Sequence, residues 1–93
     1  MVVLVSEVEL FLPEAQSLKQ KRSVLTSLKE RLHNRFNVSV AEVDHNDLWQ
    51  RSTLAVAVVS NAGEHADQVI DKVVRFIESD GRAQLIDFSV EER

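Results

Sequence analysis

Residues 2–36, VVLVSEVELFLPEAQSLKQKRSVLTSLKERLHNRF, pass from a strand pattern to a helical pattern within a few positions, and this change decides the fold. Residues 2–12 alternate with a period of two, which predicts a β-strand whose even positions face the core. From Leu18 the apolar residues recur every three or four positions, which predicts an amphipathic helix ending at Asn37. Ser17, with Gln20 three residues later, matches the capping box that starts a helix.

Two further strands follow this first strand and helix. Residues 38–43 alternate again and predict a strand. Residues 44–47 (DHND) are turn formers, which suits a hairpin connection. Residues 48–60 predict the second strand of that hairpin, with alternate side chains facing the core.

The last third of the chain repeats the helix and strand. Asn61, followed by Glu64, predicts the start of a second helix that runs to about Ser79. Residues 85–90 predict a final strand. The order β-α-β-β-α-β is the split arrangement of ferredoxin-like folds. We therefore expect residues 1–93 to form one α+β sandwich domain, with a four-stranded antiparallel sheet and both helices on one face.

The composition suits a small globular domain and excludes several classes of protein. Hydrophobic residues make up 44% and charged residues 28% of the 93 positions, which argues against disorder. The absence of cysteine excludes disulfide frameworks and thiolate zinc sites. The apolar runs are too short to span a bilayer, and the N-terminus lacks the basic start of a secretory signal. We expect a soluble cytoplasmic protein that does not engage a membrane.

One helix is basic although the chain is acidic. The net charge is −4, yet residues 17–36 hold six lysines and arginines against Glu30 alone. Because a helix N-terminus is partially positive, acids are expected in its first turn. That turn instead carries Lys19, Lys21 and Arg22. This arrangement suits the binding of phosphate or another anion.

The cations continue along this helix, where Arg22, Lys29 and His33 share one flank that suits a nucleic-acid backbone. Two alternatives stay open. In the first, the cations form a solvated face or pair with acids such as Glu7, Glu9 and Glu14. In the second, Lys21, which falls among the apolar positions, extends along the edge of the core. The residues predicted to contact nucleic acid are the cations of this helix and two residues after the hairpin turn, namely Lys19, Lys21, Arg22, Lys29, His33, Arg35, Trp49 and Arg51.

The sheet face opposite the helices is a second candidate surface. Strand alternation places small and aliphatic side chains there, Ala57 and Val59 among them, which favours packing against a second copy; a solvated face is the other interpretation. The first strand offers Glu7 and Glu9 where an RNA-recognition sheet needs aromatic residues, so base stacking on this face is not expected. Trp49 either stacks a single base or covers the end of the core, and we expect the second.

No arrangement of residues predicts catalysis. Asp44, His45 and Asp47 are explained as turn formers, because their spacing matches no metal site. No nucleophile with a base and no pair of catalytic carboxylates follows from the spacing. The arginine-bearing, glycine-rich loop of acylphosphatases, which share this fold, is absent after the first strand. We expect a protein that is not an enzyme and uses no metal or cofactor.

Three motifs in order resemble the YlxP-like family: residues 17–22 (SLKQKR), 37–43 (NVSVAEV) and 48–51 (LWQR). This family is a bacterial group of small proteins carried as a domain of unknown function, and the similarity covers essentially the whole chain. The resemblance implies a ferredoxin-like fold and a bacterial cytoplasmic protein. Genes of this family often lie beside transcription and translation factors, including a ribosome-binding factor, which points to RNA or the ribosome. No catalytic residue can be carried over.

These observations lead to two functional hypotheses. The first is a non-enzymatic binding protein that acts on RNA or a ribosomal particle through the basic helix, with no preference for DNA. The alternative is a protein-interaction or homodimerisation module that uses the open face of the sheet. An enzyme or small-ligand sensor is disfavoured, because the fold alone does not imply either function.

Overall fold

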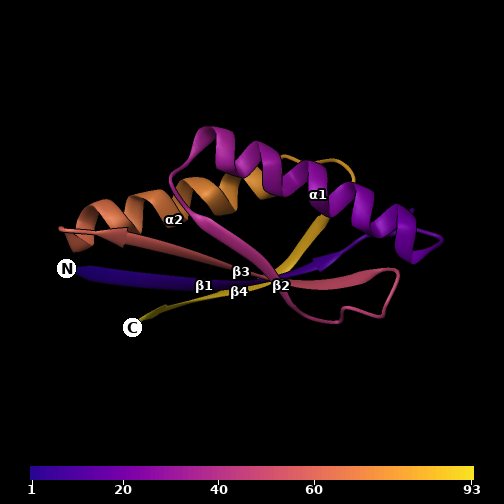
Figure 1. Cartoon of the computed structure of the whole chain (residues 1–93), viewed down its shortest axis with the longest axis horizontal. Coiled ribbons are helices and arrows are strands. Elements are labelled where there is room, and N and C mark those ends of the chain that lie inside the picture. The colour runs from indigo at the N-terminus through magenta and orange to yellow at the C-terminus, as the bar shows by residue number, and fades with distance from the viewer.

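The computed structural model describes all 93 residues, and its element order confirms the predicted β-α-β-β-α-β arrangement (Figure 1). The six elements are β1 (Val2–Phe11), α1 (Leu18–Arg35), β2 (Ser39–Asp44), β3 (Arg51–Ser60), α2 (Gly63–Glu78) and β4 (Gln84–Glu92).

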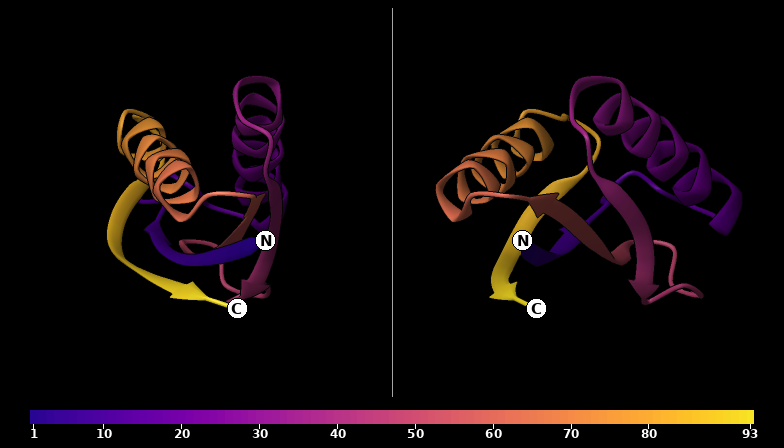
Figure 2. Two further views of the ribbon diagram at one scale, coloured as in Figure 1. Left: turned by 90° about the vertical axis from the view of Figure 1, so that its left-hand side faces the viewer. Right: turned by 60° about the vertical axis from the view of Figure 1, so that its left-hand side comes forward.

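The four strands form one antiparallel sheet in the order β2-β3-β1-β4, which confirms the ferredoxin-like fold. The central pair is in register along its whole length, from Val2 opposite Ser60 to Phe11 opposite Arg51. Both helices lie on one face (Figures 1 and 2), with α1 contacting β2 and α2 contacting β4, β1 and β3. The other face of the sheet is left open.

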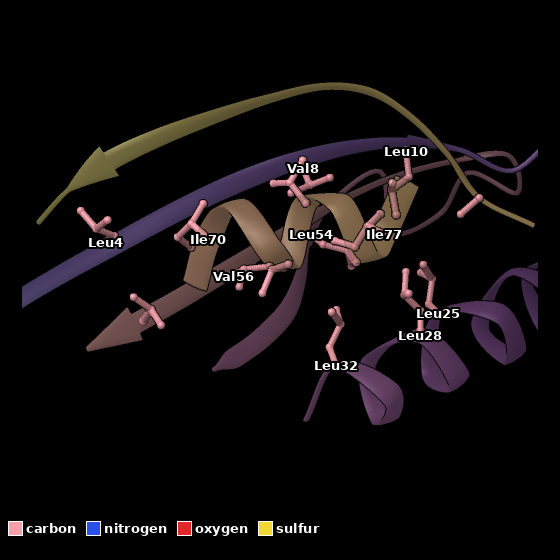
Figure 3. Packing of buried hydrophobic residues seen from close by; sticks show 14 of the residues in the cluster. Leu4, Val8, Leu10, Leu25, Leu28, Leu32, Leu54, Val56, Ile70 and Ile77 are labelled. Atoms are coloured by element: carbon pink, nitrogen blue, oxygen red, sulfur yellow. The ribbon is translucent and has the colours of Figure 1, made fainter. Parts of the chain in front are cut away.

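The core lies between the sheet and the two helices, where leucines of α1 and isoleucines of α2 point toward the even positions of β1 and β3 (Figure 3). Each such side chain contributes about 1.5–3 kcal/mol when it leaves water. No helix combines the length and the apolar character needed to cross a bilayer. The apolar side chains at the centre of the core are Val8, Leu10, Leu28, Leu32, Leu54, Val56, Val73 and Ile77.

The two helices begin differently. Ser17 caps α1 as predicted, because its side-chain oxygen accepts a hydrogen bond from the Gln20 N–H at 3.1 Å. The Gln20 side chain accepts in turn from the Gln16 N–H at 2.7 Å, one residue before the cap. The prediction that Asn61 caps α2 is wrong. Ala62 holds the N-cap position without any side-chain hydrogen bond, so the second helix depends on packing for its start.

β3 begins at Arg51, so the predicted start of this strand at residue 48 is wrong. The preceding loop is closed locally, since the Leu48 N–H donates to the His45 carbonyl at 3.0 Å and His45 has a positive φ of 61°. The Gln50 side chain donates to the carbonyl oxygens of Pro13 and Ala15, at 3.1 and 3.2 Å, in the β1–α1 connection. This contact holds the loop away from a strand conformation.

Asp80 joins α1 to the turn between α2 and β4. Its carboxylate, only 2% exposed, accepts from the Arg31 guanidinium and from the Arg82 backbone N–H, the latter at 2.8 Å. Arg82 also pairs with it through its side chain at 3.3 Å. Burial by itself raises the pKa of the Asp80 carboxyl, but the hydrogen bonds from Arg82 and Arg31 outweigh burial and hold that pKa below its usual value. The charged carboxylate is therefore part of the folded structure.

Replacing Asp80 by asparagine should lower stability at neutral pH and flatten its dependence on acid. Because the folded pKa lies below the unfolded one of about 3.9, the charge stabilises the fold fully above about pH 5, and this contribution is lost as the pH falls through the folded value. We expect Asp80→Asn to cost about 2 kcal/mol at pH 7 and much less at about pH 3. Urea denaturation at both pH values measures this. Asp47→Asn, at an exposed loop acid, is the control, and an equal cost of Asp80→Asn at both pH values would contradict the prediction.

Candidate nucleic-acid interface

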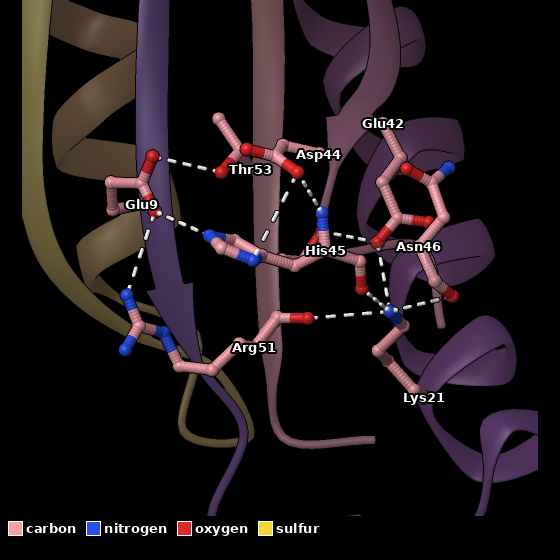
Figure 4. A network of polar contacts seen from close by, with 9 residues as sticks. Glu9, Lys21, Glu42, Asp44, His45, Asn46, Arg51 and Thr53 are labelled. Carbon is pink, nitrogen blue, oxygen red and sulfur yellow. Dashed lines mark hydrogen bonds and ion pairs between the residues drawn. The ribbon is translucent and has the colours of Figure 1, made fainter. Parts of the chain in front are cut away.

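Lys21 is fully buried, at 0% exposure, and its ammonium group is surrounded by oxygens of the β2–β3 hairpin (Figure 4). Its Nζ lies 2.9 Å from the Glu42 carboxylate and donates to the carbonyl oxygens of His45 at 2.8 Å, Arg51 at 3.2 Å and Asn46 at 3.3 Å. The prediction that Lys21 binds phosphate is therefore wrong. The alternative, in which Lys21 extends along the edge of the core, agrees better with the structure. Its ammonium group, however, ends inside the protein and does not reach solvent.

The partner of Lys21 is itself held in place. The Glu42 side chain is mostly buried and accepts a second hydrogen bond, from the Ser52 hydroxyl at 2.7 Å. The pair therefore joins the first turns of α1 to both strands of the hairpin. Because Glu42 neutralises the charge of Lys21 and the lysine side chain is fully buried, this site leaves no room for an anion.

Four of the remaining predicted residues lie along one side of α1. Lys19 and Arg22 are exposed in its first turns, and Lys29 and His33 continue the same flank at 100° per residue. Lys19, Arg22 and Lys29 form no ion pair with any acid of the chain. The structure thus brings these four side chains together as the α1 flank, defined as Lys19, Arg22, Lys29 and His33.

Arg35 lies on the opposite side of α1, between the two helices. Its guanidinium is 5.1 Å from the ring centre of Phe76, and that of Arg31 is 5.6 Å from the same ring. Phe36 packs edge-on against Phe76, with ring centres 6.0 Å apart. The α1 flank and Arg35 therefore form two separate cationic sites on the layer that the two helices make.

A shallow hollow of about 340 Å³ surrounds Arg35, and sequence reasoning missed the cations that α2 adds to it. Lys72 has no acidic partner, whereas Arg75 pairs with Asp71 at 3.0 Å. The signal was present, because Lys72 and Phe76 are one helical turn apart and both helices were expected on one face. We name this place the interhelical hollow, lined by Arg35, Phe36, Lys72, Arg75, Phe76 and Ser79.

Trp49 and Arg51 do not join the cations of the helices. Trp49 is 54% exposed in the loop before β3, so the prediction that it covers the end of the core is wrong. The Arg51 side chain points to Glu9 on the open face, with 3.7 Å between guanidinium and carboxylate, and away from Lys21 (Figure 4). A ligand held on the helices would not reach both residues.

Polar side chains also meet on the open face beside the hairpin. The Glu9 carboxylate accepts from the Thr53 hydroxyl at 2.8 Å and lies 3.7 Å from His45 Nε2. Asp44, in turn, accepts from the His45 backbone N–H at 2.7 Å. The alternative in which acids pair with the basic helix does not hold for Glu9, which pairs here with Arg51 and His45, and Glu7 and Glu14 have no ion pair. No three metal-ligating side chains come together in the chain.

Replacing Lys21 by methionine should destabilise the protein strongly. The change leaves the buried Glu42 carboxylate without its cation and the hairpin carbonyls without their donor, which costs about 3–5 kcal/mol. Lys19→Met, two positions away at an exposed site, is the matched control and should cost under about 0.5 kcal/mol. Urea denaturation of both variants measures the difference. Similar destabilisation in the two variants would show that the buried pair does not hold the hairpin.

The chain was compared with known families and proteins. The family described as "Protein of unknown function (DUF503)" matches residues 3–90. The "Uncharacterized protein YlxP" of Bacillus subtilis (strain 168) is 38% identical over 74 residues, which cover 80% of each chain. This relative confirms the resemblance that the three sequence motifs carry.

Solved structures agree on the fold. The de novo designed protein LFR1 1 with ferredoxin fold has a TM-score of 0.57 at 13% identity, covering 100% of this chain and 84% of its own. The designed protein Ferredog-Diesel has a TM-score of 0.52 at 16% identity, covering 96% and 83%. At these identities the likeness shows the fold alone. From the family match and the YlxP relative, we conclude that the chain belongs to the DUF503 family and is YlxP-like.

Proposed function

We propose that this protein is a non-enzymatic RNA-binding protein of the bacterial cytoplasm, acting on RNA or a ribosomal particle, and that its helical layer holds the phosphate backbone. One observation carries the proposal: the cations of this layer are left without acidic partners in a chain that has 15 acids and 11 lysines and arginines. Acids are therefore not scarce. The unpaired cations are Lys19, Arg22, Lys29, Arg35 and Lys72.

The position of these cations strengthens the argument. A helix dipole favours cations in the last turn, where α1 carries His33 and Arg35, but opposes them in the first turn. Lys19 and Arg22 therefore sit against the local electrostatic preference, with no acid in the first turn to offset them. An external polyanion would remove this conflict, because phosphate is stabilised by both the cations and the helix N-terminus.

The interhelical hollow supplies a second contact of the same kind. The ring of Phe76 lies against the Arg35 guanidinium and restricts its motion, so less side-chain entropy is given up when the guanidinium binds a phosphate. Lys72 adds a second unpaired charge to this hollow. The flank and the hollow lie on opposite sides of α1, which suits a folded RNA or a ribosomal particle with phosphates at several positions.

Charge reversal on α1 should weaken RNA binding and its dependence on salt. The probes are a fluorescein-labelled single-stranded RNA and purified bacterial ribosomes, measured by fluorescence anisotropy and by co-sedimentation over a range of salt. Each phosphate that is no longer neutralised by a cation should lower the log–log salt slope by about 0.7–0.9. We expect Lys19→Glu and Arg22→Glu, each made alone, to lower both affinity and slope. Arg93→Glu, an exposed cation after β4, matches each change in charge and serves as the control.

The outcome that would contradict the proposal is equally direct. Wild-type protein that binds neither probe at low salt is not an RNA- or ribosome-binding protein. Affinity and slope that the α1 variants leave untouched would remove the basic helix from the interface. An equal fall in affinity for Arg93→Glu would show a net-charge effect with no defined surface.

The open sheet face supports a second candidate, a homodimer. Val59 is 64% exposed on β3, opposite Val3, and Ala57 follows on the same face opposite Val5. An exposed valine in a regular strand, surrounded by small and aliphatic neighbours, suits packing against a second copy. Light scattering should then give twice the mass of the monomer for the wild type, and Val59→Glu should give the monomer. A monomeric wild type would contradict this candidate.

A further inference from the structure

β4 is an edge strand whose outer backbone groups have no partner strand. It pairs only with β1, and Figure 2 shows it as the outermost strand on the α2 side. The Arg93 N–H donates to the Val3 carbonyl at 2.8 Å. Because backbone groups alternate along an antiparallel strand, those of Phe88 and Val90 point away from β1 to the free edge.

The same edge carries an apolar stripe. Ile86 is 51%, Phe88 46% and Val90 43% exposed. Free edges are normally protected by charge, proline or a short strand, because unpaired backbone beside apolar side chains invites pairing. The opposite edge follows that rule, since β2 has six residues, of which Glu42 and Asp44 are acids. β4 is longer, at nine residues, and although it also carries acids, its helical side holds the exposed apolar stripe beside the free backbone groups, which points to a partner strand.

Acids lie on both sides of the stripe. On the open face of the sheet, Asp87 and Glu91 alternate with the apolar residues of β4. One flank of α2 carries Phe76, which packs against Phe36 after α1. The opposite flank, turned away from α1, therefore lies next to β4 on the helical face of the sheet. At 100° per residue this outer flank presents a row of acids, Asp67, Asp71 and Glu78, of which Asp71 pairs with Arg75.

We propose that the β4 edge binds an extended segment of another protein in which apolar residues alternate with lysine or arginine. Its backbone would pair with Phe88 and Val90, and its apolar side chains would cover the stripe on the helical side. Its cations, which point to the other face, would meet Asp87 and also Glu91, which in the free protein pairs with Arg93 at 3.0 Å. In the free protein the Asp87 carboxylate accepts from the Phe88 N–H at 2.8 Å. A carbonyl of the bound segment takes over that hydrogen bond and frees the carboxylate for a cation.

A second copy of this chain fits the edge less well. Antiparallel pairing of two β4 strands about Phe88 aligns the apolar stripes, but it sets Asp87 of one copy diagonally next to Glu91 of the other. It also turns the acidic outer flanks of both α2 helices toward each other. Like charges therefore gather along the interface, whereas a basic segment meets opposite charge on both faces.

The test uses a synthetic peptide with the proposed pattern, acetyl-KVKIKVK-amide, added to the full chain and followed by NMR. We expect the amide hydrogen exchange of Val90 to slow by about tenfold or more at saturation, because its N–H becomes hydrogen-bonded, and that of Phe88 to slow as its N–H exchanges the exposed Asp87 carboxylate for a backbone carbonyl in a ladder. A peptide of the same sequence with backbone N-methyl groups on its pairing side keeps the charge but cannot form the ladder. It should give no such protection.

Two variants locate the site. Asp87→Lys with Glu91→Lys removes both open-face acids and should weaken peptide binding by about tenfold, since two surface pairs are removed. Asp47→Lys, at an exposed acid of the hairpin loop, should leave binding within about twofold. Equal affinity for the N-methylated peptide would overturn the proposal, because attraction by charge alone would explain it. A dimer that Phe88→Lys separates would also overturn it, since a second copy would then hold the edge.

Discussion

The buried ammonium group of Lys21 is the constraint on which the rest of the structure depends. Removing this charge from water costs several kcal/mol, and the cost is met only because the Glu42 carboxylate and three hairpin carbonyls converge on it. The contact fixes the start of α1 against the end of the sheet. It also gives the hairpin loop one conformation, in which Trp49 stays exposed and the Arg51 side chain turns to the other face.

The cations of α1 fall into two groups, those that pair with an acid of the chain and those that do not. Lys21 and Arg31 serve the fold, one through Glu42 near the start of α1 and the other through Asp80 at the turn after α2. Both acids are largely buried, so removing either cation would leave an uncompensated buried charge. The other lysines and arginines of α1 are free of partners. The excess of cations therefore has a share that pairs within the fold and a share that is left without an acidic partner.

The fold could be predicted from the sequence because burial controls the spacing of apolar residues in the two central strands and in both helices. These four elements and the face of β1 that enters the core follow from that spacing alone. The predictions that failed concern single positions whose conformation depends on residues far away in the sequence. The start of β3 depends on Gln50 reaching the β1–α1 connection, and the burial of Lys21 depends on oxygens some 24 to 30 residues away. The spacing did mark Lys21 as a core position, but nothing in it named the partners. The interhelical hollow could be predicted only by knowing how the two helices are placed relative to each other.

The separation of charge across the sheet gives the molecule an electric dipole moment. The unpaired cations of α1 lie toward the β2 side, and the acids of β4 and of the outer flank of α2 lie toward the opposite edge. In the field of a polyanion such a molecule is turned before contact, with α1 leading and β4 trailing. Orientation of this kind raises the fraction of productive encounters without any added contact. It also leaves the free strand edge facing away from the polyanion.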